Sequence, residues 1–112
     1  MPTDPRTWLF DIDEAGERLN RFLAGKGWHD YQHDDLLRAA TERQFEIIGE
    51  ALNQLRKHSP AHAARIREHE KIIGFRNILI HGYAVVDDAV VWSAAREKLP
   101  LLLADVAALL GE

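Results

Sequence analysis

The stretch DDLLRAATERQFEIIGEALNQLRK, residues 34–57, decides the fold of this chain. Its apolar side chains recur at steps of three and four residues, which is the spacing of one face of an α-helix. Asp34 is well placed to cap the helix, because a carboxylate accepts hydrogen bonds from the N–H groups of the first turn. The expected buried face contains Leu37, Ala40, Gln44, Ile48, Ala51 and Leu55, widened by Phe45, Ile47 and Leu52. We therefore predict one long helix here.

Gly49 lies in the interior of this predicted helix. Glycine costs about 1 kcal/mol relative to alanine at such a position. Because it has no side chain, it lets a second backbone come close. We therefore expect Gly49 to mark the close approach of another helix.

The segment before this helix shows the same spacing. Asp4 followed by Pro5 predicts a helix start, since the carboxylate can cap and proline is tolerated at the first helical position. The apolar face that follows consists of Trp8, Ile12, Ala15, Leu19 and Phe22. Residues 25–27, Gly-Lys-Gly, end this helix. They do not predict a phosphate-binding loop, because the flanking strand and the rest of that motif are missing.

A third helical segment follows the long helix. Ser59 before Pro60 repeats the combination of a capping residue and a proline. We expect this segment to break near residues 68–70 and to end at Gly82, since glycine commonly closes a helix.

The last helix is expected to be capped by Asp87 or Asp88 and kinked by Pro100, which removes one backbone donor and crowds the preceding turn. Its apolar face consists of Val91, Ala94, Ala95, Leu99, Leu102, Val106 and Leu109. No alternating β pattern persists beyond a few residues. The sequence predicts an all-α fold, an up-and-down bundle of four to five helices, in one domain over residues 1–112.

Composition narrows the class of protein. The 112 residues are 46% hydrophobic and 29% charged, as in ordinary globular proteins, and include no cysteine, which excludes disulfides and thiolate metal sites. Neither a membrane span nor a signal peptide is apparent, so we expect a cytoplasmic location and no membrane partner. The net charge of −4 argues against broad electrostatic binding of nucleic acid, although a small local basic site remains compatible with it.

The segment RNILIHGY, residues 76–83, carries the most informative polar side chains. Arg76, Asn77, His81 and Tyr83 lie there on an apolar background, where polar groups without partners are costly. Arginine and histidine together suit phosphodiester chemistry, because they supply a fixed cation and a proton carrier that titrates near neutrality. The same pair also occurs as a structural cap at helix C-termini, so both interpretations stay open.

Helical geometry separates the two candidate catalytic residues. At about 100° per residue, Arg76 and His81 lie roughly 140° apart on one helix, whereas Asn77 and His81 share a face. The arginine side chain could wrap around the helix, or the helix could loosen before Gly82. Alternatively, a second copy of the chain could supply the missing partner across a symmetric apolar interface.

A row of polar residues on the second helix has two interpretations. Arg43, Glu46, Glu50 and Asn53 follow one another at spacings of three, four and three. Such a row is usually a solvated face with modest pair energies. In the alternative, Glu46 or Glu50 flanks a cleft and orients Arg76.

Two histidine pairs raise the question of a metal site. His29 and His33 are four apart, as are His58 and His62. Neither pair has a nearby carboxylate or other third ligand. We therefore expect neither a metal nor another cofactor.

The segment 76–83 resembles the R-x4-H-x-Y signature of HepT-type toxins, a branch of the HEPN ribonuclease superfamily. Further similarity lies in residues 47–51 (IIGEA), 72–75 (IIGF), 86–87 (VD), 91–92 (VW) and 99–100 (LP), and the resemblance covers about residues 5–110. It implies a HEPN-like bundle that forms a homodimer with both signatures facing one cleft. It also implies metal-independent endoribonuclease activity and a cognate minimal nucleotidyltransferase antitoxin, which silences the toxin by transferring AMP to Tyr83.

On these residues we expect His81 to move a proton, Arg76 to bind phosphate oxygens, and Asn77 to orient either His81 or the phosphate. Two alternatives remain. The chain could be a non-catalytic HEPN module that binds a nucleotide or a nucleotidyltransferase. It could also be a structural dimer whose signature only caps a helix and whose Tyr83 only packs against the helix end.

Overall fold

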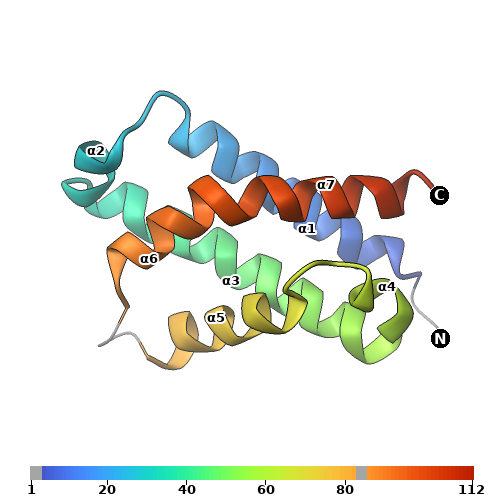
Figure 1. The fold of residues 1–112 in the computed structure, drawn as a ribbon. Coiled ribbons are helices and arrows are strands. Elements are labelled where there is room, and N and C mark those ends of the chain that lie inside the picture. Colours follow the sequence, from blue (N-terminus) through green and yellow to red (C-terminus); the bar gives the residue numbers. More distant parts are fainter. Residues whose placement is uncertain (1–3, 83–85) are drawn as a thin grey trace.

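The computed structural model describes residues 4–82 and 86–112, and all regular secondary structure in them is helical. The longer helices are α1 (Arg6–Leu23), α3 (Asp35–His58) and α5 (His69–His81), and the last helical run consists of α6 (Asp88–Ser93), the π-helical segment η2 (Ala94–Lys98) and α7 (Leu99–Leu110). Two short helices, α2 (Trp28–Gln32) and α4 (Pro60–Ala64), lie in the connections. The predicted all-α bundle is confirmed (Figure 1).

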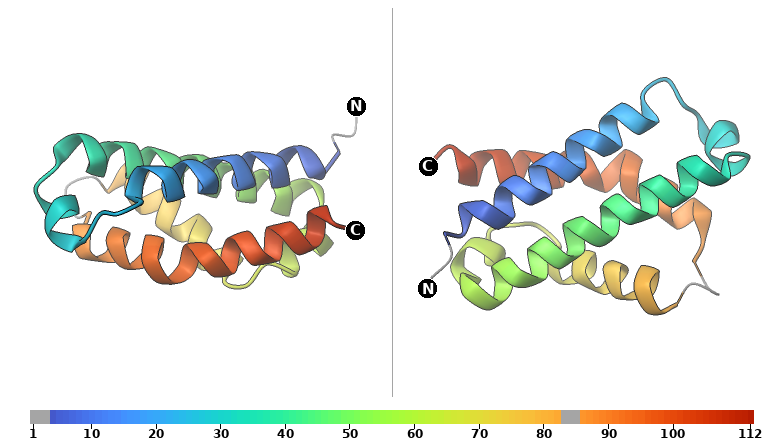
Figure 2. Two further views of the ribbon diagram at one scale, coloured as in Figure 1. Left: turned by 90° about the horizontal axis from the view of Figure 1, so that it is seen from above. Right: turned by 180° about the vertical axis from the view of Figure 1, so that it is seen from behind.

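Helix α3 organises the bundle (Figure 2). It packs against α1 on one side and α5 on the other, and α1 in turn packs against α7. Most of the predicted apolar faces meet in the core. In α1, Leu9 and Leu23 are buried whereas the predicted Trp8 and Phe22 are only partly buried. Three further predicted residues are also only partly buried, namely Ala40, Ile47 and Ala94. In α3 the buried residues are Leu37, Thr41, Gln44, Phe45, Ile48, Gly49, Ala51, Leu52 and Leu55.

The helix starts follow the local signals in the sequence. The Asp34 side chain accepts a hydrogen bond from the Leu37 N–H at 3.0 Å, and Asp87 caps α6 by accepting one from Ala89. Asp4 accepts from the Arg6 N–H at 2.9 Å, so it serves the first turn although α1 begins at Arg6. These contacts satisfy N–H groups that have no partner within their own helix.

The connection between α4 and α5 is tied to the last helix. The break expected near residues 68–70 lies slightly earlier, at residues 65–68, and Glu68 adopts a left-handed φ of 58° there. The backbone N–H and the guanidinium of Arg67 both donate to the Asp105 carboxylate, and this interaction holds the pKa of Asp105 below its ordinary value. Gly82 ends α5, as predicted, with its N–H donating to the Ile78 carbonyl.

The irregularity expected at Pro100 takes the form of the π-helical segment η2, which directly precedes α7. The N–H of Leu99 donates to the carbonyl of Ala94, five residues earlier. The proline ring normally clashes with the backbone of the preceding helical turn. The wider π-helical turn before Pro100 gives the ring the space that it needs. Pro100 then occupies the first turn of α7, where its missing N–H costs little.

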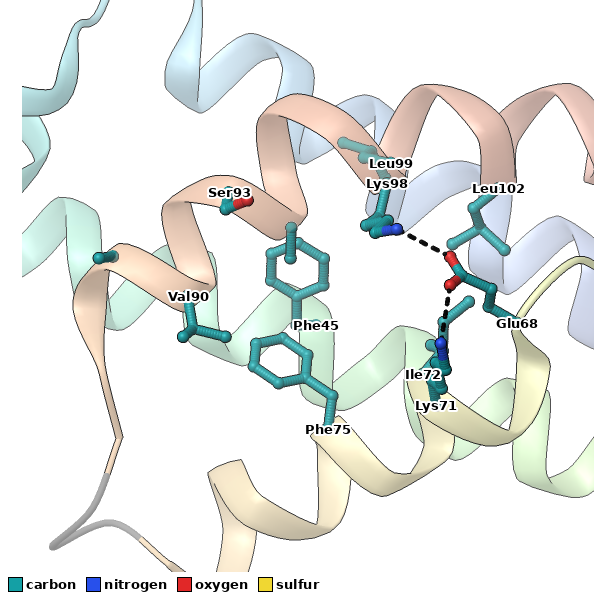
Figure 3. Close-up of a pocket in the computed structure, with 12 residues that line it drawn as sticks. Phe45, Glu68, Lys71, Ile72, Phe75, Val90, Ser93, Lys98, Leu99 and Leu102 are labelled. Carbon is teal, nitrogen blue, oxygen red and sulfur yellow. Dashed lines mark hydrogen bonds and ion pairs between the residues drawn. The ribbon is translucent and has the colours of Figure 1, made fainter.

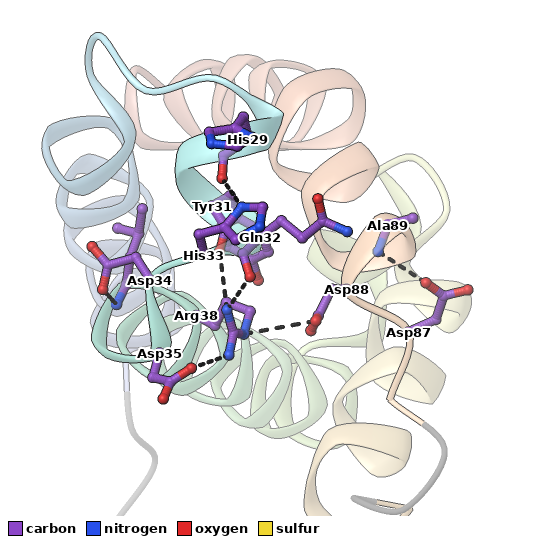
Figure 4. Close-up of polar contacts among 11 residues, drawn as sticks. His29, Tyr31, Gln32, His33, Asp34, Asp35, Arg38, Asp87, Asp88 and Ala89 are labelled. Carbon is purple, nitrogen blue, oxygen red and sulfur yellow. Dashed lines mark hydrogen bonds and ion pairs between the residues drawn. The ribbon is translucent and has the colours of Figure 1, made fainter.

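Arg38 holds α2, α3 and α6 together at one end of the bundle (Figure 4). Its guanidinium donates to the carbonyls of Tyr31 and Gln32 and forms ion pairs with Asp35 and Asp88. Neither α2 nor this network was predicted from the sequence, because the partners come from separate helices. No helix in the two described ranges combines the length and apolar character needed to cross a membrane.

Candidate functional site

Gly49 is the point at which α5 approaches α3. A Cβ added at Gly49 would clash with the Cβ of Arg76 and lie 2.6 Å from its Cγ. The expectation of a close helix approach at Gly49 is therefore confirmed. The side chain that fills the space belongs to the arginine of the 76–83 segment, so the contact sets where the arginine leaves its helix.

The guanidinium of Arg76 is held by two polar partners. Its Nη2 forms an ion pair with Glu50 of α3, and its Nη1 donates to Asn77 Oδ1 at 2.9 Å. The Arg76 side chain is only 22% exposed, and within the described residues its buried Nε has no hydrogen-bond partner. An orphaned buried donor is costly, which marks this arginine as a residue whose placement serves more than packing.

A pocket of about 340 Å³ opens beside Arg76, where α1, α3 and α5 meet. Its walls consist of Trp8, Asp11, Arg43, Glu46, Ile47, Glu50, Ala51, Gln54, Arg76 and Ile80. The structure thus brings Arg43, Glu46 and Glu50 together with Arg76, and we name this site the Arg76 pocket. Whether these side chains take part in a reaction stays a prediction.

Three polar or aromatic wall residues of the pocket were not among the predicted site residues. Trp8 was assigned to the apolar face of its helix, and Asp11 and Gln54 were not singled out. Gln54 donates to Glu50 at 3.1 Å, whereas the predicted row member Asn53 accepts from Arg56 outside the pocket. The spacing of four between Glu50 and Gln54 was the available signal.

His81 does not line the Arg76 pocket in the part of the chain that the structure describes. It is the last residue of α5 and is exposed, as is Asn77 one turn earlier. Residues four apart on a helix have neighbouring side chains. The hydrogen bond from Arg76 to Asn77 therefore links the arginine to the residue that shares a face with His81. Tyr83 falls outside the described residues, and the prediction about it stays untested.

The exposed side of the C-terminal half of α5 includes one large apolar side chain. Gly74, Asn77, Ile78 and His81 follow at helical spacing, and we name them the outer face. Ile78 is 49% exposed, and a Cβ added at Gly74 would meet nothing within 4 Å. An apolar side chain and a helix-destabilising glycine thus lie side by side on an open surface.

A second cavity, of about 400 Å³, separates α5 from the last helical run (Figure 3). Phe45, Ile72, Phe75, Val90, Leu99 and Leu102 supply most of its apolar wall. At one end Glu68 binds Lys98 at 3.1 Å and Lys71 at 3.3 Å, and these contacts lower its pKa. This cavity shares no wall residue with the Arg76 pocket.

The histidine pairs make local contacts. The rings of His29 and His33 lie 4.3 Å apart, and His58 stacks on Trp8. Across residues 4–82 and 86–112, no group of three or more histidine, aspartate and glutamate side chains is arranged to hold a metal ion.

The chain is similar to known proteins over most of its length. The family model described as "Ribonuclease HepT-like" matches residues 12–109. A "Putative RNase" of Methanocaldococcus jannaschii is 28% identical, covering 92% of this chain and 94% of its own. Another "Putative RNase", from Caldanaerobacter subterraneus subsp. tengcongensis, is 33% identical over 88% of this chain and 87% of its own. A "Probable ribonuclease HepT" of Thermococcus cleftensis is 31% identical over 91% and 92%. No solved structure matches significantly.

Proposed function

The chain belongs to the family of HepT-like ribonucleases, and from this premise we propose that it is a metal-independent endoribonuclease that acts as the toxin of a toxin–antitoxin pair. The observation that carries the proposal is the placement of Arg76. Gly49 and Glu50 hold it against α3, and its guanidinium donates to Asn77, the residue that shares a face of α5 with the exposed His81.

In the proposed reaction the 2′-OH of a ribose attacks the adjacent phosphorus. The new P–O2′ bond forms as the P–O5′ bond breaks, which leaves a 2′,3′-cyclic phosphate and a 5′-hydroxyl end. His81 accepts the proton of the 2′-OH or donates one to the leaving 5′-oxygen. Because the nucleophile is the 2′-OH, DNA is not a substrate.

Arg76 binds the non-bridging phosphate oxygens, and its contribution is greatest as negative charge builds in the transition state. Its hydrogen bonds to Glu50 and Asn77 occupy two of its five N–H donors. Glu50 orients the guanidinium, and Asn77 orients either the phosphate or His81.

We further propose that the working form is a homodimer in which α5 of each chain meets its counterpart through the outer face. Burial of Ile78 would remove apolar surface from water, and Gly74 would let the two backbones come close. The dimer would bring His81 of one chain toward Arg76 of the other. The two residues could then act together although they point in different directions on one helix.

Cleavage of RNA by a His81→Ala variant tests the catalytic role. We expect wild-type protein to cut single-stranded RNA in the presence of EDTA, to produce cyclic phosphate ends, and to leave DNA of the same sequence intact. His81→Ala should lose cleavage by about 100-fold or more while its circular dichroism spectrum and melting temperature stay unchanged. His29→Ala, which changes an exposed histidine on α2, is the matched control. Undiminished cleavage by His81→Ala would end the proposal.

Mixing two inactive variants tests the shared site. In a mixture of Arg76→Ala and His81→Ala chains, half of the dimers contain one chain of each variant. If each site takes Arg76 from one chain and His81 from the other, one of the two sites in such a dimer has both side chains intact. Activity should recover to about a quarter of the wild-type value if the site spans two chains. No recovery, although the two chains exchange, would assign Arg76 and His81 to the same chain.

Silencing is proposed to occur at Tyr83, through AMP transfer by a cognate minimal nucleotidyltransferase antitoxin. Tyr83 follows His81 by two residues, so a bulky anion attached to it would lie beside the proposed site and repel RNA phosphates. Mass spectrometry after coexpression with such an enzyme should find AMP on the peptide that contains Tyr83, and Tyr83→Phe should escape silencing. Silencing without any added AMP would contradict this mechanism.

A non-catalytic HEPN module is the second candidate. The net charge of −4 favours it, because it disfavours broad electrostatic binding of RNA. This candidate predicts no RNA cleavage, together with an increase of the melting temperature when AMP is added.

A further inference from the structure

The Arg76 pocket contains more polar chemistry than the positioning of one arginine requires. Three of its wall residues are carboxylates, namely Asp11, Glu46 and Glu50, and the walls also include Arg43 and the Arg76 guanidinium itself. The carboxylates therefore outnumber the arginines. A phosphate would be repelled from the interior of this pocket, whereas a neutral group that donates N–H hydrogen bonds would be favoured.

Glu50 is already engaged, because it pairs with Arg76 and accepts from Gln54. Asp11, which is exposed, and Glu46, which is partly buried, form no hydrogen bond or ion pair among the described residues, so both can accept hydrogen bonds from a group that enters the pocket. A carboxylate oxygen accepts hydrogen bonds and donates none at neutral pH. A ligand in this pocket is therefore expected to donate hydrogen bonds to Asp11 and Glu46.

The remaining walls suit a flat, largely apolar ring. Trp8, Ile47 and Ile80 line the pocket from three different helices. The indole of Trp8 is held by stacking on His58, with ring centroids 4.9 Å apart and planes inclined by 14°. The volume of about 340 Å³ lies within the usual range for small-molecule sites, about 300–1,000 Å³.

From these features we propose that the Arg76 pocket is a nucleobase subsite that selects adenine, cytosine or guanine over uracil. The inference rests on the proposed function, since Arg76 at the pocket edge would hold the scissile phosphate while a flanking base enters. The three selected bases carry an exocyclic amino group that can donate to Asp11 or Glu46. Uracil has carbonyl oxygens in place of such a group. Its one donor on that edge, N3–H, lies between two of these oxygens, so a carboxylate that accepts from N3–H would also face them unfavourably.

Substrates with a single ribonucleotide in a DNA strand test this selectivity, because the one 2′-OH fixes the position of cleavage. Two series are needed, with the base varied on the ribonucleotide and on the nucleotide after it. In one series we expect kcat/KM for uracil to be lower than for the other three bases by about tenfold or more. The double variant Asp11→Asn/Glu46→Gln should lower kcat/KM for adenine, cytosine and guanine toward the value for uracil and so reduce this discrimination to less than about threefold.

Glu17→Gln is the matched control, because Glu17 is an exposed carboxylate on α1 outside the pocket. It should keep both the rate and the base preference. Equal cleavage of all four bases in both series would overturn the proposal, and so would an unchanged preference in the double variant.

Nucleoside binding separates a failure of this inference from a failure of the proposed function. In ¹⁵N-labelled His81→Ala protein, adenosine should shift the indole N–H signal of Trp8, and uridine should do so much less. If wild-type protein does not cut RNA but adenosine still shifts this signal, the base subsite stands without the nuclease. If RNA is cut and no nucleoside shifts it, the subsite is wrong. A response only to an arginine-containing peptide would assign the pocket to a protein side chain and would equally overturn the proposal.

Discussion

Gly49 and Arg76 form the contact on which the proposed site depends. The glycine was recognisable in the sequence as a costly helix residue, and the structure identifies its partner as Arg76. Because the backbones of α3 and α5 approach at this point, the guanidinium emerges next to Glu50, the following residue of α3. A single contact of this kind sets both helix packing and the position of a charged group.

Gly49→Ala tests this contact. The added methyl group would overlap the Cβ and Cγ of Arg76. These atoms lie close to the backbone, so the overlap can be relieved only if α3 and α5 move apart. We expect the free energy of unfolding to fall by about 1–3 kcal/mol, as measured by urea denaturation, and RNA cleavage to fall further because Arg76 is displaced.

Gly74→Ala is the matched control, since it changes another glycine inside a helix but meets no atom within 4 Å. In the isolated chain it should raise stability by about 1 kcal/mol. An equal effect of the two substitutions would show that helix propensity, and not the approach of Arg76, determines the result at Gly49.

Among the longer helices α1, α3 and α5, α5 packs extensively against one neighbour only. Its extensive packing is against α3, whereas the apolar cavity lined by Ile72 and Phe75 lies between it and the last helical run. Segments with few packed neighbours open more readily than the core of a domain. We expect backbone amides of α5 in the isolated chain to exchange with solvent faster than those in the middle of α1 and α3, as measured by hydrogen–deuterium exchange. Equal protection of the three helices would contradict this.

Where α3 meets α6, the carboxyl group of Glu42 lies in surroundings that disfavour its charged form. Burial raises the pKa of Glu42, and the carboxylates of Asp88 and Glu46 raise it further, while Arg38 opposes them. When the pKa of a carboxyl group is raised in the folded state, the charged form of that group destabilises the folded state relative to the unfolded state. The folded state therefore gains stability as the pH falls through the raised pKa, and this gain is complete below the ordinary value of 4.5.

Glu42→Gln should therefore raise the melting temperature at pH 7, and the advantage should disappear near pH 4, where the wild-type carboxyl is protonated. Thermal denaturation followed by circular dichroism across this range measures the effect. Glu17→Gln, at an exposed position of α1, should show no such dependence. A stabilisation of Glu42→Gln that does not vary with pH would point to a cause other than charge.

At the scale of the whole molecule, the outer face of α5 is expected to determine assembly. Ile78→Glu would bring two like charges together across a twofold axis. We expect it to convert the proposed dimer to a monomer in analytical ultracentrifugation and to abolish RNA cleavage. Leu36→Glu, at the most exposed large apolar side chain of the described residues, 79% exposed, should leave both unchanged. A dimer that persists in Ile78→Glu would place the interface elsewhere.

The sequence by itself determined the helices, because their signals are local. The caps at Asp34 and Asp87, the end of α1 near Gly25 and the end of α5 at Gly82 depend on residues within one turn. Hydrophobic periodicity likewise identified most of the buried face of each helix, since every helix of a bundle must turn its apolar side inward.

Only the tertiary structure decided which polar side chains meet. The Arg76 pocket joins α1, α3 and α5, and the Arg38 network joins α2, α3 and α6. Sequence spacing relates residues on one helix, but it contains no direct record of how two helices are rotated against each other. That rotation follows from side-chain packing over the whole core, and it places Arg76 against Gly49 while it leaves His81 exposed at the end of α5.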